Sequence, residues 1–335
     1  MLDQPLSPTV IIAESNEQDG TVPVRSDRRF RKIGFVGLGR MGTAMAANLA
    51  TSGHDVTAFI RRPDQVKGLC MLGVVPTLNL SDLAECEIVV SMLPDDPAVR
   101  EVFFGCGVRG GLADLLPATA IHLSMSTIST TASTEFARRH AARGQFYIAA
   151  PVFGNPDAAW ARQLFIVLAG PTAQCEDCRA VVENLGKTYI AGTTPAQAHL
   201  IKLLGNMMTA TTLEVLGEVI AVLKKSGQDA QQFVDIMTGT MFGSRVHKIY
   251  GNRIVAEDYK AGLALPLALK DVRLALAEAE KAGVPTPTIG VVRDRLIAGI
   301  ARGHGGLDWT GLALVAAEEA GLSRPTRSID PARPV

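Results

Sequence analysis

Residues 32–42 read KIGFVGLGRMG, and this stretch decides the fold. Its apolar run leads directly into Gly37, Gly39 and Gly42, which have the GxGxxG spacing, and a helical pattern then continues to Ser52. A second apolar run follows at residues 55–60. Strand, glycine turn, helix and strand in this order predict a dinucleotide-binding unit, because the glycines let the backbone approach a pyrophosphate and the helix N-terminus attracts its charge. The expected contacts are Gly37, Leu38, Gly39, Arg40, Met41 and Gly42.

The residues after the second run indicate which dinucleotide binds. NAD-binding chains usually carry Asp or Glu about 20 residues after the glycines, where the carboxylate accepts hydrogen bonds from the ribose. Ile60 holds that place here, and Arg61 and Arg62 come next. Two solvated arginines are common elsewhere, but at the tip of this strand their guanidinium groups suit a 2′-phosphate. NADP(H) is therefore the predicted cofactor.

Two sequence patterns divide the chain. Up to about residue 190, helical patterns separate short apolar runs at 32–37, 55–60, 87–93, 119–124, 146–151, 164–170 and 187–192. This alternation predicts a doubly wound parallel sheet that is buried on both faces. Helical patterns alone follow, at 196–226, 230–239, 244–257, 267–283, 288–302 and 308–321. We predict an α/β Rossmann domain over 31–194 and an all-α domain over 195–324, joined by a long interdomain helix, with disordered tails at 1–30 and 325–335.

Composition argues against several classes of partner. Lys+Arg and Asp+Glu number 33 each in 335 residues, so no excess charge attracts nucleic acid or an anionic membrane surface. Charged residues interrupt every long apolar stretch, so no membrane span is expected. Five cysteines, an odd number, suit a reducing compartment, and the cytoplasm is the expected location. We interpret the CxxC pair Cys175 and Cys178 as two packed thiols on one helix face, without a metal.

Six motifs, in this order along the chain, resemble the β-hydroxyacid dehydrogenase family. The family's 3-hydroxyisobutyrate dehydrogenase-like branch belongs to the 6-phosphogluconate dehydrogenase superfamily, and the imine reductases are relatives with a similar two-domain design. The motifs are IGFVGLGRMGTAMAANLATSGHDVTAF (33–59), VVSMLPDD (89–96), MSTIS (125–129), AAPVFGNPDAA (149–159), HLIKLLGN (199–206) and LALKDVRLALAEAEKAGVPTP (267–287). The resemblance extends from Lys32 to about Leu322.

This resemblance implies a role for particular residues. Lys202 matches the family's catalytic lysine and Asn206 its active-site asparagine. Lys270 matches the lysine that contacts the nicotinamide end of the cofactor, with Asp271 as its orienting partner. The resemblance also places Leu93 and Pro94 against the adenosine side of the cofactor, and Ser126 and Thr127 near the nicotinamide ribose.

The residues themselves support the pair on the long helix. Lys202 and Asn206 have i, i+4 spacing, so both lie on one face of a segment that is otherwise apolar. Desolvation there would lower the pKa of the lysine toward the range useful for proton transfer. The alternative is a lysine that extends along an amphipathic helix into solvent. His199, one turn earlier, is expected to be a surface or packing residue.

One segment departs from the family pattern. Where relatives have Ser-Gly-Gly after Pro-Val, to bind a substrate carboxylate, this chain has Phe153, Gly154 and Asn155. An aromatic ring in place of a hydroxyl favours an apolar or uncharged group. We expect these three residues to contact substrate, and Phe242 of the helical domain as well, although a core position for Phe242 is equally open.

Together these features predict NADPH-dependent reduction of a small carbonyl compound, or oxidation of the matching hydroxy acid, with Lys202 as general acid/base. The expected partners are a small-molecule substrate and further copies of the chain, as a homodimer or homotetramer. Phe153 favours the alternative of an imine reductase or reductive aminase. A non-catalytic NADPH-binding module is the second alternative, and it requires Lys202 to face solvent.

Overall fold

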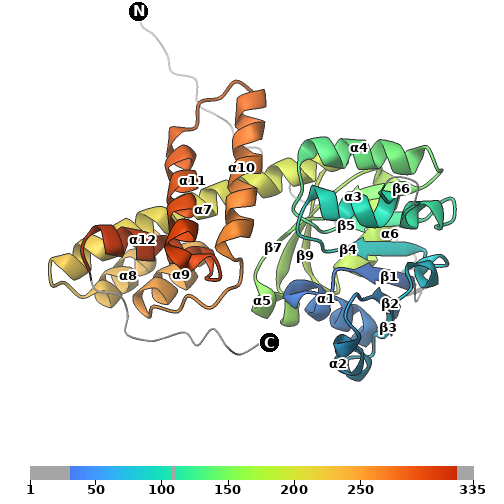
Figure 1. Cartoon of the computed structure of the whole chain (residues 1–335), viewed down its shortest axis with the longest axis horizontal. Coiled ribbons are helices and arrows are strands. Elements are labelled where there is room, and N and C mark those ends of the chain that lie inside the picture. The colour runs from blue at the N-terminus through green and yellow to red at the C-terminus, as the bar shows by residue number, and fades with distance from the viewer. Residues whose placement is uncertain (1–30, 107–109, 323–335) are drawn as a thin grey trace, which may run out of the picture. The chain divides into compact units, whose positions relative to one another are not determined.

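The structure is a computed structural model that describes residues 31–106 and 110–322. The tails predicted at 1–30 and 325–335 lie outside the described residues. An α/β domain with a central sheet is followed by a domain of helices, and this arrangement confirms the predicted fold class (Figure 1).

The first six strands form the parallel part of the sheet. They are β1 (Lys32–Val36), β2 (Asp55–Phe59), β3 (Val75–Thr77), β4 (Ile88–Ser91), β5 (Ile121–Ser124) and β6 (Phe146–Ala149), and they lie in the order β3-β2-β1-β4-β5-β6. The order reverses between β1 and β4, which is where ligands bind in open α/β sheets. The short strand β3 was missed by the sequence pattern, because three residues are too few to display an alternation.

The remaining strands correct the prediction of a wholly parallel sheet. They are β7 (Val152–Phe153), β8 (Leu164–Ala169) and β9 (Gly186–Gly192). β8 runs antiparallel to β6 and β7, and β9 pairs in parallel with β8. The chain between β6 and β8 holds only β7 and a five-residue helix, which is too short for a parallel crossover. β9 is also not buried on both faces, since Lys187, Tyr189 and Ile190 are exposed.

Helices cover both faces of the sheet. They are α1 (Arg40–Thr51), α2 (Val66–Met71), α3 (Asp96–Phe104), α4 (Thr130–Ala141), α5 (Pro156–Trp160) and α6 (Thr172–Val182). Residues of α1, α2, α5 and α6 share one core with Ile88 and Val90 of β4, whereas α3 and α4 share the other core with Val89. Successive strand residues therefore point to opposite faces, as a pleated strand requires.

The second domain consists of helices. They are α7 (Pro195–Lys225), α8 (Ala230–Gly239), α9 (Arg245–Val255), α10 (Leu265–Lys281), α11 (Pro287–Gly299) and α12 (Leu312–Glu319). A π-helical turn at Ile300–His304 follows α11, and a short 3₁₀ helix at Trp309–Gly311 leads into α12. The sheet ends at Gly192 and α7 begins at Pro195, where the proline fits the first helical position.

The 31-residue helix α7 belongs to both domains. It packs on α4, β6, β8 and β9 of the first domain and on α9, α10, α11 and α12 of the second. By length and composition alone α7 could cross a membrane, but core helices of globular proteins meet the same criterion. Four polar residues are buried along this helix, namely His199, Lys202, Asn206 and Glu214. The helix therefore holds polar side chains inside the protein.

Candidate active site

The glycine turn has the shape that a dinucleotide requires. Gly37 has φ +100°, and a Cβ there would lie 2.3 Å from the carbonyl oxygen of Met92. A Cβ at Gly42 would lie 1.9 Å from the carbonyl oxygen of Gly37, so helix α1 can approach the strand only with glycine at this position. A Cβ at Gly39, in contrast, would meet no atom of the described residues within 4 Å, and none of their side chains caps the N-terminus of α1. This open turn with unpaired N–H groups fits a pyrophosphate.

Arg61 and Arg62 lie at the same edge of the sheet as the glycine turn. They follow β2, whose Phe59 pairs with Val36 of β1, and both are exposed. Gln65 Nε2 donates to Leu38 O at 3.1 Å, which attaches this segment to the glycine turn. Neither arginine forms an ion pair with another described residue, so both guanidinium groups are available to a ligand.

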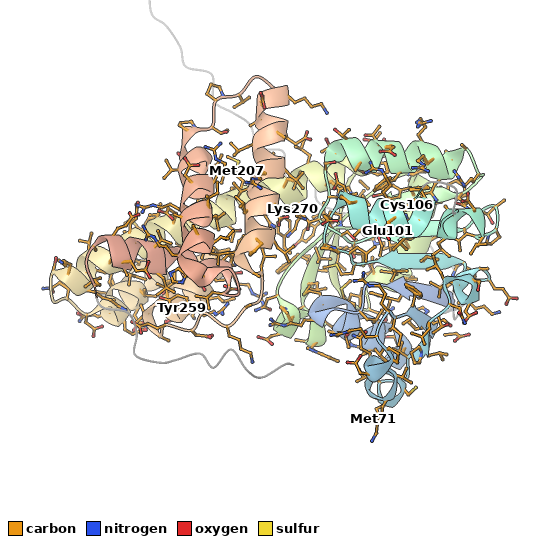
Figure 2. All side chains as sticks on the ribbon, viewed as in Figure 1. Met71, Glu101, Cys106, Met207, Tyr259 and Lys270 are labelled. Carbon is orange, nitrogen blue, oxygen red and sulfur yellow. The ribbon has the colours of Figure 1, made fainter. Side chains whose placement is uncertain are left out.

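The loops after β4 and β5 are joined to each other and to the helical domain. Leu93 N donates to Ser126 Oγ at 2.8 Å, and Ser126 Oγ is 3.3 Å from Ser91 O. Lys270 Nζ, from α10, donates to Pro94 O at 2.8 Å and also to Thr127 O. Figure 2 shows Lys270 where the helices face these loops. The structure thus brings together Leu93, Pro94, Ser126, Thr127 and Lys270.

Lys270 and Asp271 are closer than the helix geometry predicts. Adjacent residues on a helix point in different directions, and the two side chains do have different main partners, Asn206 of α7 for Asp271 and Pro94 O for Lys270. Lys270 Nζ nevertheless lies 3.0 Å from Asp271 Oδ1, so the long lysine side chain folds back toward its neighbour. The ion pair agrees with the orienting role that the resemblance implied for Asp271.

Lys202 is buried at the centre of a polar chain. Lys202 is only 7% exposed, so its side chain does not extend along the helix into solvent. Nζ donates to Asn206 Oδ1 at 2.8 Å, and Asn206 Nδ2 donates to Asp271 Oδ2 at 2.6 Å. Burial lowers the pKa of Lys202 to about 8, with Asp271 opposing the shift and Lys270 adding to it. An amine in this state exchanges protons readily near neutral pH.

Phe153 lies against this amine. The Nζ of Lys202 is 4.4 Å from the centre of the Phe153 ring, within cation–π distance. The neighbouring Gly154 is exposed, and Asn155 Oδ1 accepts a hydrogen bond from Ala158 N as the N-cap of α5. Of the predicted substrate segment, Phe153 is therefore the residue that touches Lys202.

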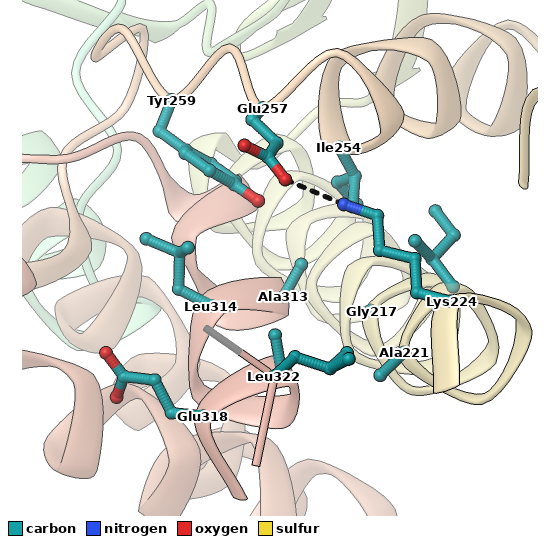
Figure 3. Close-up of a pocket in the computed structure, with 12 residues that line it drawn as sticks. Gly217, Ala221, Lys224, Ile254, Glu257, Tyr259, Ala313, Leu314, Glu318 and Leu322 are labelled. Carbon is teal, nitrogen blue, oxygen red and sulfur yellow. Dashed lines mark hydrogen bonds and ion pairs between the residues drawn. The ribbon is translucent and has the colours of Figure 1, made fainter. Parts of the chain in front are cut away.

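Phe242 is not brought to Lys202 within one chain. It is 46% exposed and lines an apolar cavity of about 290 Å³ together with α8 and residues 211–219 of α7. Those residues begin more than two helical turns beyond Lys202. A second cavity, of about 150 Å³, lies between α7, α12 and residues 254–259, beside the Lys224–Glu257 ion pair of 2.8 Å (Figure 3). None of the predicted site residues lines either cavity except Phe242.

A chain of buried polar groups supports the loop after β4, and sequence reasoning did not find it. Gln145 Nε2 donates to two backbone carbonyls, so its Oε1 accepts from His140 Nδ1 at 2.8 Å. His140 Nε2 then accepts from His122 Nδ1 at 2.9 Å, and His122 Nε2 accepts from Ser91 Oγ at 2.8 Å. Burial lowers the pKa of both histidines, that of His140 to about 4, so both stay neutral. A histidine inside the apolar run AIHLS was the available signal.

His199 is a second buried group that the sequence did not assign to the site. It is fully buried, and the Tyr147 hydroxyl lies 3.3 Å from its Nε2. Burial, with the nearby charge of Lys270, lowers the pKa of His199 to about 3, so it is neutral. The expectation of a packing residue is met, although its Nδ1 has no hydrogen-bond partner among the described residues. Cys175 and Cys178 are also buried and free, and burial raises the pKa of both thiols.

Comparisons with known proteins agree with this geometry. Residues 32–193 match the NAD binding domain of 6-phosphogluconate dehydrogenase, and residues 196–323 match the NAD-binding domain of NADP-dependent 3-hydroxyisobutyrate dehydrogenase. The 2-hydroxy-3-oxopropionate reductase of Escherichia coli is 31% identical over 284 residues, which cover 84% of this chain and 95% of the relative.

Solved structures show the same architecture. A 3-hydroxyisobutyrate dehydrogenase from Mycobacterium tuberculosis has a TM-score of 0.74 and 26% identity, covering 85% of this chain and 98% of its own. An imine reductase from Bacillus cereus has a TM-score of 0.56 and 20% identity, covering 85% and 98%, and it shares the fold.

The fold and the site together define a two-domain oxidoreductase that uses a nicotinamide dinucleotide. More closely, the chain belongs to the β-hydroxyacid dehydrogenase family, in its 3-hydroxyisobutyrate dehydrogenase-like branch, with imine reductases among its structural neighbours. The predicted family is confirmed.

The buried histidines predict a loss of stability in weak acid. His140 has a pKa of about 4 when folded and about 6.5 when unfolded, so its contribution is complete above pH 6.5 and is lost as the pH falls toward 4. Burial raises the pKa of Glu214 to about 7, so protonation of Glu214 increases the stability of the fold as the pH falls through this range, opposite to the effect of His140. The comparison must therefore be made against a His140→Gln variant.

Urea unfolding at pH 7 and pH 5 measures this effect. From pH 7 to pH 5, the free energy of unfolding of the wild type should fall by about 2 kcal/mol more than that of His140→Gln. This difference comes from the pKa shift of His140 alone. Equal losses in the two proteins would show that His140 is not held neutral by the fold.

Proposed function

We propose that this chain is an NADPH-dependent reductase of a small carbonyl compound, an aldehyde, semialdehyde or β-keto acid, or oxidises the matching hydroxy acid, with Lys202 as general acid/base. The observation that carries the proposal is the buried amine of Lys202, hydrogen-bonded to Asn206. The name of the Escherichia coli relative, a reductase, supports the reductive direction.

The residues of the chain have separable parts in this reaction. When bound, the cofactor supplies the hydride that goes to the carbonyl carbon. Negative charge then develops on the carbonyl oxygen, and the Lys202 ammonium stabilises that charge and gives the oxygen a proton. Asn206 Oδ1 holds one N–H of the amine, and Asp271 fixes the orientation of the Asn206 amide. The amine is therefore positioned before the substrate arrives.

The pKa of Lys202 sets the direction of the pH dependence. Because the pKa is about 8, the ammonium needed for reduction is present below pH 8 and is lost as the pH rises through that value. We expect kcat for reduction to fall with an apparent pKa near 8, and kcat for oxidation to rise over the same range. A reduction rate that stays flat from pH 6 to pH 10 would contradict this assignment.

Replacing Lys202 with methionine tests the amine itself. The Lys202→Met variant should lose something like two to four orders of magnitude in kcat, the usual span for general acid catalysis, because no donor meets the developing alkoxide. NADPH binding, measured by fluorescence titration, should be unchanged. Lys187→Met, which removes an exposed lysine from β9, is the matched control and should be fully active. Wild-type turnover in Lys202→Met would make that lysine structural.

The preference for NADP over NAD is part of the proposal. It is supported by the position of Arg61 and Arg62 beside the glycine turn and by their lack of ion-pair partners among the described residues. Replacing both with alanine should weaken NADPH binding by roughly 10- to 100-fold, since about 1.5–3 kcal/mol is typical of hydrogen bonds to charged groups. NADH binding should be nearly unchanged. Equal losses for the two cofactors, measured by calorimetry, would contradict the assignment.

We also propose that the chain forms a homodimer or homotetramer through α7 and acts in the cytoplasm. Large apolar side chains on α7 remain exposed, among them Leu200, Ile201, Leu204, Met208, Val215 and Val222. So many exposed apolar groups on one helix favour association with a like surface. All five cysteines are free, which suits a reducing compartment.

A charge on α7 tests the oligomer. Met208→Glu should shift the sedimentation velocity peak toward monomer, because a carboxylate would be buried in the interface. Met71→Glu is the matched control, since Met71 is similarly exposed but lies on α2. A monomeric wild type, or an unchanged Met208→Glu oligomer, would contradict an interface on α7.

The second candidate function is an imine reductase or reductive aminase. The aromatic ring of Phe153 against Lys202 favours it, because it gives the site an apolar wall. NADPH oxidation with a cyclic imine such as 1-pyrroline, but with no aldehyde, would establish this alternative. The non-catalytic module needs a solvent-facing Lys202, and the burial of that residue argues against it.

A further inference from the structure

The position of the Phe153 ring depends on a glycine. A Cβ built at Gly205 on α7 would lie 2.4 Å from Cζ and 2.5 Å from Cε1 of Phe153. The ring therefore lies directly on the backbone of α7 at Gly205. In the sequence, this glycine stands between Lys202 and Asn206. Any side chain at position 205 would push the ring away from the Lys202 amine.

The contacts of the Lys202 amine leave few hydrogen-bond donors for a charged substrate. An ammonium group has three N–H donors. One goes to Asn206 Oδ1, and the Phe153 ring covers a second side of the nitrogen at 4.4 Å. The one N–H that neither contact uses can serve a single carbonyl oxygen. It cannot also satisfy the two oxygens of a carboxylate.

Two other polar groups of the site are already engaged. Lys270 contacts Pro94 O, Thr127 O and Asp271, so its charge is compensated. At the N-terminus of α5, Asn155 Oδ1 occupies Ala158 N, and Pro156 has no N–H to offer. A carboxylate placed beside Phe153 would lose its water and gain neither of these groups as a free donor, which is costly.

We propose that Phe153, seated on Gly205, narrows the carbonyl class of the proposed function to its uncharged members with an apolar group beside the carbonyl, and so disfavours the keto acids. Phe153 and Gly205 are then specificity-determining residues. This inference rests on the proposed function, because it assumes reduction at Lys202. The apolar group packs on the ring, and the carbonyl oxygen takes the remaining N–H of Lys202. Hydride adds to the carbonyl carbon and the lysine proton to the oxygen, so an alcohol and NADP⁺ are formed.

Two aldehydes test the proposal, one with a carboxylate and one with that carboxylate capped as its methyl ester. They are 4-oxobutanoate and its methyl ester, with NADPH oxidation followed at 340 nm. In the wild type, kcat/KM for the ester should exceed that for the acid by at least about tenfold, equivalent to about 1.4 kcal/mol. An acid that is reduced as well as or better than the ester overturns the inference and leaves the proposed function standing. No turnover of either aldehyde overturns both.

Variants locate the effect in the ring and its seat. Phe153→Ser removes the ring and adds a hydroxyl, and it should shift the ester-to-acid ratio at least tenfold toward the acid. Gly205→Ala alters no polar group but displaces the ring, so it should shift the ratio in the same direction. Gly290→Ala on α11 is the matched control, because a Cβ there would meet no atom of residues 31–106 and 110–322 within 4 Å. Its ratio should equal that of the wild type.

The variants also separate specificity from damage to the fold. Loss of folding in Gly205→Ala, seen by circular dichroism, leaves Phe153→Ser as the deciding variant. The proposal requires the ratio of the two kcat/KM values to change in Phe153→Ser, whereas a merely structural role would lower both values together. A Phe153→Ser protein that keeps the wild-type ratio overturns the assignment of Phe153.

Discussion

Removal of one lysine amine from water is the constraint on which the rest of this structure depends. A buried ammonium is stable only if other groups replace its lost hydration. At Lys202 this is done by the amide of Asn206, the ring of Phe153 and, one step further, the carboxylate of Asp271. The replacement is incomplete, and the pKa of the amine falls to about 8 as a result. Because its hydration is only partly replaced, the amine can still interact with an oxygen that gains negative charge.

Two neighbouring residues of α10 connect the polar groups around Lys202 with the loops of the dinucleotide site. On α10, Asp271 reaches Asn206 of α7, while Lys270 reaches Pro94 O and Thr127 O in the loops after β4 and β5. Helix α7 itself packs on both the sheet and the other helices of the second domain. The distance between the buried amine and the loops of the dinucleotide site is therefore set by regular helices, which hold side chains more precisely than loops do.

Sequence patterns predicted the features that repeat locally. The glycine turn, the alternation of strands and helices, and the i, i+4 pair of Lys202 and Asn206 are all visible within short windows, and the structure has each of them. The antiparallel strand β8, the seat of Phe153 on Gly205 and the chain from Ser91 to Gln145 could not be predicted. They depend on contacts between residues far apart in sequence, and an apolar strand reads alike in either direction.

The most direct test of the central claim is a crystal structure with NADPH and butan-1-ol, an uncharged product alcohol. The two cannot react with each other, because both are in their reduced form. We predict that the alcohol oxygen lies within hydrogen-bond distance, about 3 Å, of Lys202 Nζ, with its chain against the ring of Phe153. An alcohol bound elsewhere, or a Lys202 side chain turned away from the cofactor into solvent, would contradict the role of this amine in catalysis.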